Sequence, residues 1–225
     1  MKKIISLVCA FVSIITIAQN KPLKDVNLDQ LISDTQYTND STDDIEIIWW
    51  LPTEYWQSVF AQDESSSQAE SDMIVEMLEN YTLTIVIKGK VGMFGGVTFT
   101  PREIIENELS VTYNGVDLKL VAEDKLSPDL VNFLSVIKPM MKNMLGPMGE
   151  NMQVFLFENK KGSKYIKTNP RSEGELTFRL DTYSKNVDLP LGSLIMEKVC
   201  PQDNTLHTGK WTYCPYHGAK LEPQR

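Results

Sequence analysis

Stretches with strand character and stretches with helix character follow one another between residues 45 and 183, and this mixture limits the possible folds. The stretches with strand character are IEIIWWLP from Ile45, TLTIVIKGKV from Thr82, NMQVFLFEN from Asn151 and ELTFRLDTY from Glu175. Within LSVTYNGVDLKL, the pair Asn114-Gly115 suits a tight primed turn between two paired strands. We therefore predict an α+β body over residues 45–189, with a mainly antiparallel sheet covered by two or three helices.

Two longer stretches predict the main covering helices. Ser67 and Glu70 have the spacing of a capping box, and apolar residues recur at helical spacing after them, which predicts a helix over 67–81. The longest predicted helix starts at Ser127-Pro128 and runs to about Leu145. Its apolar residues cover so wide a face that we expect this helix to be buried.

The first residues resemble an export signal. Lys2 and Lys3 precede an apolar run from Ile4 to Ile17, and small residues stand at the positions that a signal peptidase reads. We predict a signal peptide over residues 1–18 and a bacterial protein that is periplasmic or secreted. No second long apolar run follows, so we expect no transmembrane segment after signal cleavage. The polar residues 19–44 predict a flexible lead-in.

The charge of the chain argues against nucleic acid as a partner. The formal net charge is −8, and cleavage after Ala18 would remove two lysines and no acid, which gives −10. Proteins that bind nucleic acid need a basic surface. We therefore expect no nucleic-acid partner, and the partner is an unidentified protein or small ligand.

All cysteines and histidines of the expected mature chain lie in its last residues. Cys9 is inside the predicted signal peptide, which leaves Cys200, Cys214, His207 and His217. The body can therefore form neither a Ser-His-Asp triad nor a Cys-His pair, and it has no HExxH zinc helix. We expect an exported non-catalytic protein, such as a binding or envelope-assembly module.

Two alternative functions start from other residues of the body. Trp49, Trp50 and Trp56 with Tyr55 could stack on sugar in a carboxylate-dependent, glycosidase-like hydrolase, although aromatic clusters more often fill cores. In a metal-handling protein, a methionine series could bind Cu(I) together with the tail. Gly-Pro interrupts that series and methionine also fills cores; its members are Met140, Met144, Met148 and Met152.

The tail, residues 190–225, contains two similar units, CPQDN from Cys200 and CPYHG from Cys214. Residues 200–221 resemble a degenerate zinc ribbon, a family in which two Cys-Pro-x-Cys-Gly knuckles are joined by a hairpin. The resemblance implies a closed structural zinc site formed by Cys200, Asp203, Cys214 and His217. Asp203 and His217 stand where the family has cysteines, and zinc accepts both carboxylate and imidazole ligands. Between the knuckles, LHTGKWTYC suggests a hairpin that turns at Thr208-Gly209.

A disulfide between Cys200 and Cys214 is the competing interpretation of the tail. An exported protein meets oxidising conditions, and these two cysteines are the ones left to pair. Such a bridge would stabilise the fold by about 3 kcal/mol in the chain-entropy model. The two interpretations exclude each other, because a disulfide sulfur has no thiolate to offer a metal. The expected cofactor is thus a structural zinc ion or none.

Overall fold

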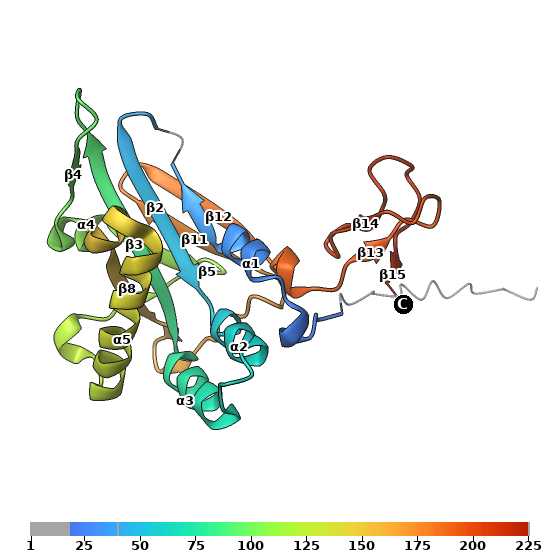
Figure 1. Cartoon of the computed structure of the whole chain (residues 1–225), viewed down its shortest axis with the longest axis horizontal. Coiled ribbons are helices and arrows are strands. Elements are labelled where there is room, and N and C mark those ends of the chain that lie inside the picture. The colour runs from blue at the N-terminus through green and yellow to red at the C-terminus, as the bar shows by residue number, and fades with distance from the viewer. Residues whose placement is uncertain (1–18, 40, 225) are drawn as a thin grey trace, which may run out of the picture.

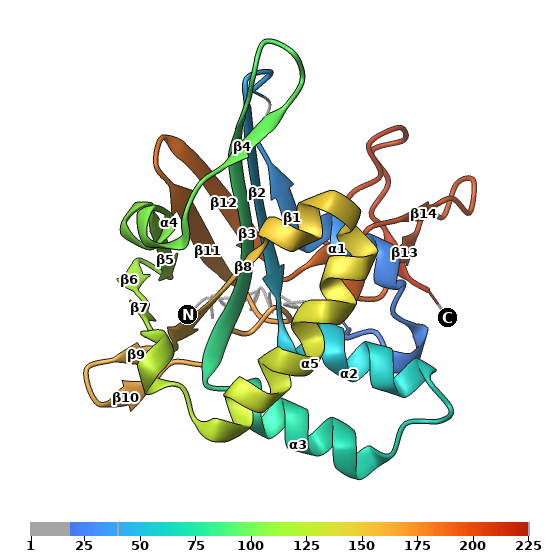
Figure 2. The ribbon, with the colours of Figure 1, turned by 60° about the vertical axis from the view of Figure 1, so that its left-hand side comes forward.

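The computed structural model describes residues 19–39 and 41–224, so the predicted signal peptide lies outside the described residues. Helices, a six-stranded sheet and a four-stranded sheet form three layers, which Figure 2 shows from the side. Every strand pairing of the two sheets is antiparallel, which confirms the predicted α+β class. No helix among the described residues combines the length and the apolar character needed to cross a membrane.

The six-stranded sheet runs in the order β1-β2-β3-β8-β7, with β4 paired to β3. Its strand β2 is buried on both faces, since Trp50 packs against Phe178 of the other sheet and Trp49 packs against Tyr55 of α2, with ring centroids 6.5 and 6.2 Å apart. This position explains the nearly continuous apolar run of β2. The strands are β1 (Gln36–Thr38), β2 (Asp44–Leu51), β3 (Tyr81–Val91), β4 (Val97–Phe99), β7 (Lys119–Leu120) and β8 (Gln153–Glu158).

The four-stranded sheet runs in the order β12-β11-β5-β6. The primed turn is confirmed, because Asn114 and Gly115 both have positive φ, 49° and 73°, between β5 and β6. A small hairpin of β9 and β10 lies in the basic stretch after β8. These strands are β5 (Leu109–Tyr113), β6 (Val116–Asp117), β9 (Lys160–Lys161), β10 (Lys164–Tyr165), β11 (Gly174–Leu180) and β12 (Tyr183–Leu189).

Both predicted covering helices are present. The capping box of Ser67 and Glu70 starts α3, which ends at Leu78 because Tyr81 already begins β3. Ser127 caps α5. The buried apolar face of this helix is narrower than predicted, since Val136 is 71 % exposed. The helices are α1 (Leu28–Thr35), α2 (Thr53–Gln62), α3 (Gln68–Leu78), α4 (Arg102–Glu108) and α5 (Pro128–Leu145), with short 3-10 turns η1 (Leu23–Asp25), η2 (Glu123–Lys125), η3 (Gly146–Asn151) and η4 (Gly192–Leu194).

The prediction of a flexible lead-in over residues 19–44 is wrong for its central part. Helix α1 and strand β1 occupy this segment, with Asn27 capping α1 by accepting a hydrogen bond from the Gln30 amide. Leu31 is completely buried and Val26 nearly so, and both belong to the core of the body. A polar segment can dock in this way because a few well-spaced apolar residues are enough to fill the edge of a core.

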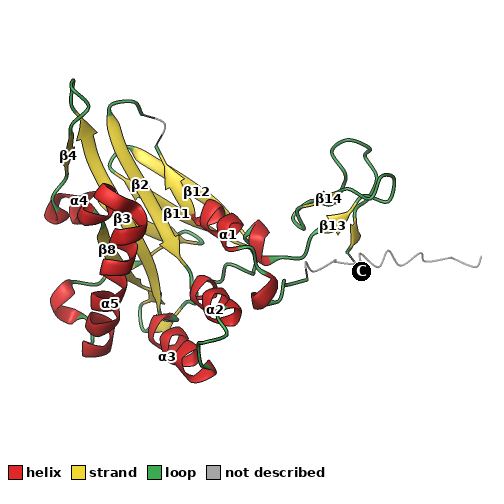
Figure 3. Cartoon of the chain, viewed as in Figure 1, coloured by secondary structure: helices red, strands yellow, loops and turns green. Residues whose placement is uncertain are grey.

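The boundary between body and tail also lies later than residue 190. Leu191 and Leu194 are buried in the main core, so the separate tail begins near strand β13. Strands β13 (Lys198–Val199), β14 (Leu206–His207) and β15 (Glu222–Pro223) form its three-stranded sheet. Figure 3 shows this tail beside the body, composed of short strands and loops. An ion pair between Lys21 and Glu197, with Nζ and Oε1 2.6 Å apart, connects the two parts.

Candidate functional site

The two Cys-Pro units of the tail form the same turn. The amide of Asn204 donates to the carbonyl of Cys200 at 2.9 Å, and the amide of Gly218 donates to the carbonyl of Cys214 at 2.9 Å. Asn204 and Gly218 both adopt the left-handed conformation, with φ of 60° and 63°. Asparagine and glycine are the residues that tolerate this conformation best. The tail therefore contains two equivalent knuckles, each of which begins with a cysteine.

The predicted hairpin with its turn at Thr208-Gly209 is wrong. Strand β14 pairs antiparallel with the preceding strand β13, with Leu206 opposite Val199. The first knuckle, which connects these two strands, is therefore itself the hairpin turn. The second knuckle is flanked in the same way by the bridge between Tyr213 and Lys220. The left-handed residue at the end of each Cys-Pro unit reverses the chain within the knuckle. The segment between the knuckles therefore connects them and does not form the predicted hairpin.

The knuckles bring three of the four predicted ligands together. Cys200 Sγ, Cys214 Sγ and a ring nitrogen of His217 all lie within 4.8 Å of one another. The Nδ1 atom of His217 is 3.4 Å from Cys200 Sγ and 3.6 Å from Cys214 Sγ. Tetrahedral zinc, with bonds of about 2.3 Å to sulfur and 2.0–2.1 Å to nitrogen, would hold sulfur and nitrogen about 3.6 Å apart. This group could therefore hold a metal ion.

Asp203, the fourth predicted ligand, lies at the edge of this group. Its Oδ2 atom is 3.8 Å from Nδ1 of His217, but it is not among the three mutually close residues. Its other oxygen accepts hydrogen bonds from the hydroxyl and amide of Thr205, at 2.7 and 3.0 Å. These bonds lower the pKa of Asp203 to about 2, so the carboxylate is ionised at neutral pH. Its charge suits a cation, although its position is partly set by Thr205.

His207 is a second candidate for the fourth position, and the sequence pattern did not single it out. Its Nε2 atom is 3.5 Å from Cys214 Sγ. Its ring lies near Trp211 and Tyr216, with centroids 5.6 and 6.2 Å apart, and these contacts restrict the ring. His207 stands outside the knuckle spacing and approaches Cys214 from β14, but like Asp203 it is not among the three mutually close residues, and its Nε2 atom is also 3.1 Å from the Thr205 hydroxyl. The only available signal was that it is one of two histidines, both in the tail.

The two thiols have different acidities. Burial alone would raise the pKa of Cys214, but the backbone amides of His217 and Tyr216 favour its thiolate and lower the pKa to about 7. Burial raises the pKa of Cys200. Both cysteines are free thiols in the structure. Metal binding requires the thiolate, so an ion would bind with release of protons.

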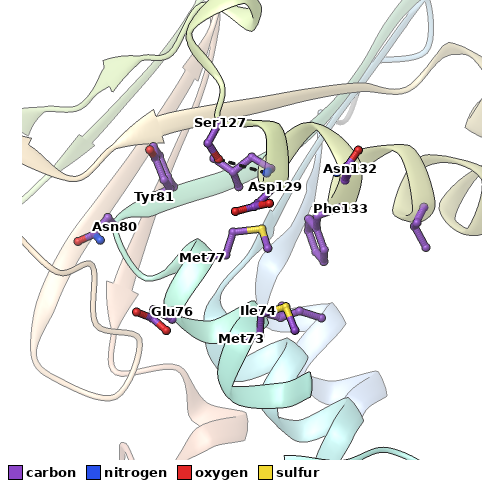
Figure 4. Close-up of a pocket in the computed structure, with 12 residues that line it drawn as sticks. Met73, Ile74, Glu76, Met77, Asn80, Tyr81, Ser127, Asp129, Asn132 and Phe133 are labelled. Atoms are coloured by element: carbon purple, nitrogen blue, oxygen red, sulfur yellow. Dashed lines mark hydrogen bonds between the residues drawn. The ribbon is translucent and has the colours of Figure 1, made fainter. Parts of the chain in front are cut away.

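A groove of about 800 Å³ between α3 and α5 is the second candidate site (Figure 4). Apolar side chains from both helices form most of its surface. Glu76 and Asp129 contribute carboxylates but do not point toward one another in Figure 4, as an acid and base acting on one bond would. The residues that line it are Met73, Ile74, Glu76, Met77, Asn80, Tyr81, Ser127, Asp129, Leu130, Asn132, Phe133 and Val136.

The remaining candidate residues from the sequence are the tryptophan cluster and the methionine series. Trp49, Trp50 and Trp56 are all buried, so the interpretation of this cluster as core is confirmed and these rings offer no surface to a sugar. In the methionine series, Met152 is buried, whereas Met140 and Met148 are exposed, and the side chain of Met144 lies outside the description. The three described members of the series therefore differ in their exposure to solvent.

The fold and the cluster define an α+β protein with a small C-terminal unit whose Cys200, Cys214 and His217 could hold a metal ion. Comparisons with protein-family models, with curated proteins and with solved structures find no match to this chain. Its function is therefore inferred from its own residues.

Proposed function

We propose that this protein is an exported, non-catalytic binding or envelope-assembly module whose tail is closed by a structural zinc ion. The observation that carries the metal site is the pair of distances from His217 Nδ1 to the two cysteine sulfurs, 3.4 and 3.6 Å. They match the separation of about 3.6 Å between sulfur and nitrogen ligands of tetrahedral zinc. Cys200, Cys214 and His217 would be three ligands, and Asp203 or His207 would be the fourth.

The size of the tail supports a structural role for the ion. Its own hydrophobic cluster contains three buried residues, Cys200, Cys214 and Leu221. Units shorter than about 40 residues usually need a metal, a disulfide or a partner to fold, because they bury too little apolar surface. A metal bound at the centre of this cluster would connect both knuckles and replace the missing core.

The ligand types favour zinc and a closed site. Two thiolates with an imidazole suit zinc, whereas oxygen-rich sites suit magnesium or calcium. A fourth ligand from Asp203 or His207 would complete the tetrahedron, and a complete tetrahedron of protein ligands leaves no position for a reacting water. Under this proposal the ion stabilises the tail, and binding is a property of the body.

Metal analysis and a thiol count on the purified protein without residues 1–18, and therefore without Cys9, test the proposal. We expect one zinc per chain and two free thiols after chelation and unfolding. Cobalt in place of zinc should show the absorption of a tetrahedral thiolate complex. A chain without metal, lighter by two hydrogens and without free thiols, would contradict the zinc site and support a Cys200-Cys214 disulfide.

Two variants identify the fourth ligand. Asp203→Asn and His207→Gln each remove one candidate and keep Cys200, Cys214 and His217. We expect the variant that removes the true ligand to weaken zinc affinity and to change the cobalt spectrum, while the other variant leaves the spectrum unchanged. Gln202→Ala is the matched control, because Gln202 is an exposed residue of the first knuckle. Unchanged spectra in both ligand variants would show that neither residue binds the ion.

A further inference from the structure

The groove between α3 and α5 lies in an acidic part of the protein. From residue 53 to residue 87 the chain has seven acids and neither lysine nor arginine. Glu76 and Asp129 belong to the groove lining, which contains no cationic residue. The nearby lysines lie beyond the lining, and each is close to an acid: Lys138 to Glu123, Lys142 to Glu150, Lys160 to Glu158 and Lys167 to Glu79. A ligand in the groove therefore meets negative charge at its rim.

The surface of the groove is apolar and partly open. Met73 is 60 % exposed on α3 and Val136 is 71 % exposed on α5, while Leu130 and Phe133 form a buried floor between them. Contiguous apolar surface of this kind usually marks a binding site. Methionine side chains adapt to the shape of a bound partner, and Met77 joins Met73 on the same side of the groove. The groove thus combines an adaptable apolar surface with an acidic rim.

We infer that this groove binds a basic amphipathic helix of a partner protein. An amphipathic helix places its apolar face in such a groove with side chains spaced at i, i+3, i+4 and i+7. Lysine or arginine on the flanks of that helix would face Glu76 and Asp129, which complements the charge of the rim. The inference rests on the proposed role as a binding module and is independent of the metal.

Other occupants fit the charges less well. The carboxylate of a fatty acid would meet two carboxylates of the same sign in the groove. A second copy could offer Met93 and Phe94, which are fully exposed at the tip between β3 and β4, at the end of the body opposite α3 (Figure 1). At the base of that hairpin, Asp43 directly precedes β2, Asp44 pairs opposite Lys90, and the Asp43 carbonyl accepts a hydrogen bond from the Val91 amide. With two acids and one lysine, this base would bring a net negative charge to the acidic rim, whereas a basic helix brings a positive one.

Two synthetic peptides of about 14 residues, roughly four helical turns, test the inference. Both have leucine at the i, i+3, i+4 and i+7 positions, and one has lysine at the remaining positions where the other has glutamate. Binding of a labelled peptide to the purified full-length protein is followed by fluorescence anisotropy. We expect saturable one-to-one binding of the lysine peptide that weakens with added salt. The glutamate peptide should bind at least about tenfold more weakly, because like charges meet at the rim.

Variants of exposed residues assign the binding to the groove. Met73→Ser and Val136→Ser should each weaken lysine-peptide binding about tenfold, since each removes apolar contact area without changing the charge of the groove. Glu76→Lys should weaken it about two- to fivefold, which is the size expected for one exposed charge pair. Asp117→Lys makes the same change in net charge at an exposed residue outside the lining, and it should leave binding unchanged.

Several results would overturn the inference. These are equal binding of both peptides, no loss of binding in Met73→Ser and Val136→Ser, or equal losses in Glu76→Lys and Asp117→Lys. Bound lipid that is lost in the groove variants, or an oligomer that dissociates in Phe94→Ser, would identify a different occupant. Zinc content is measured on the same samples. Full zinc with no peptide binding would overturn the groove inference alone, and peptide binding by a chain without zinc would overturn the metal site alone.

Discussion

Removal of the metal should unfold the tail and leave the body folded. The perturbation is chelation of the reduced protein, or the substitution Cys200→Ser, which removes one of the two thiolates. The tail and the body have separate hydrophobic clusters, so loss of the smaller one leaves the larger intact. Gln202→Ala is the control, because it changes the same knuckle without removing a candidate ligand.

The expected magnitude follows from the small size of the tail's core. Ordering the 22 residues from Cys200 to Leu221 costs about 20 kcal/mol, at a low value of about 1 kcal/mol per residue. Burial of Leu221 contributes about 1.5–3 kcal/mol, and each small cysteine contributes less. About 15 kcal/mol is then missing, which is close to the roughly 10–16 kcal/mol that structural zinc provides in zinc-finger peptides at neutral pH.

Amide hydrogen exchange measured by mass spectrometry tests this prediction. With metal bound, the amides of Asn204 and Gly218 should exchange slowly, because both donate to carbonyls in the knuckle turns. After chelation, peptides from Cys200 to Leu221 should exchange at the rate of an unfolded chain, while peptides from β2, β3 and β8 stay protected. Retained protection of the tail in the chelated, reduced protein would refute the argument that its own core is too small.

The other predictions concern the body and are measured by urea unfolding of each variant. Lys88→Met should destabilise by about 3 kcal/mol, because Lys88 is only 12 % exposed and its loss leaves the buried Glu46 carboxylate, 3.4 Å away, without its cation. Burial lowers the pKa of Lys88, but Glu108 and the other nearby acids raise it overall. The difference in unfolding free energy between the wild type and Lys88→Met should therefore persist to about pH 10 and shrink only at higher pH. A destabilisation below about 1 kcal/mol would show that the ion pair is replaceable. Leu31→Ala should cost about 2–5 kcal/mol, and a cost near zero would show that α1 does not belong to the core. Gly115→Ala should destabilise the protein by about 1 kcal/mol, because this residue has a positive φ. Phe94→Ser should change stability by less than about 0.5 kcal/mol, because its side chain is fully exposed. A large loss of stability in Phe94→Ser would mean that the tip packs on another surface.

Local signals in the sequence were enough to predict several elements of the body. The capping box at Ser67 and Glu70, the turn at Asn114-Gly115 and the cap at Ser127 each lie where the structure has them. These features depend on backbone preferences of a few neighbouring residues, so they do not require knowledge of the rest of the fold. The capping of α1 by Asn27 is a signal of the same kind, but the polar composition around it hid the helix.

Contacts between distant residues could not be predicted in this way. The packing of Trp50 against Phe178 joins residues 128 positions apart, and nothing in the local sequence of either strand indicates that two sheets stack at this point. The groove likewise depends on α3 and α5 lying side by side. Val136 belongs to a broad apolar pattern along α5, yet it faces solvent because the adjacent layer covers only part of the helix.

For the candidate metal site, the sequence alone determined which residue types were available and that they all stand in the tail. The resemblance of the two Cys-Pro units to zinc-ribbon knuckles also implied three of the residues that meet, Cys200, Cys214 and His217. Tertiary structure decided that Asp203 lies at the edge and that His207 approaches from β14. The physical reason is that a turn positions its own residues through local backbone geometry, whereas the approach of a residue from another strand depends on how the two knuckles pack.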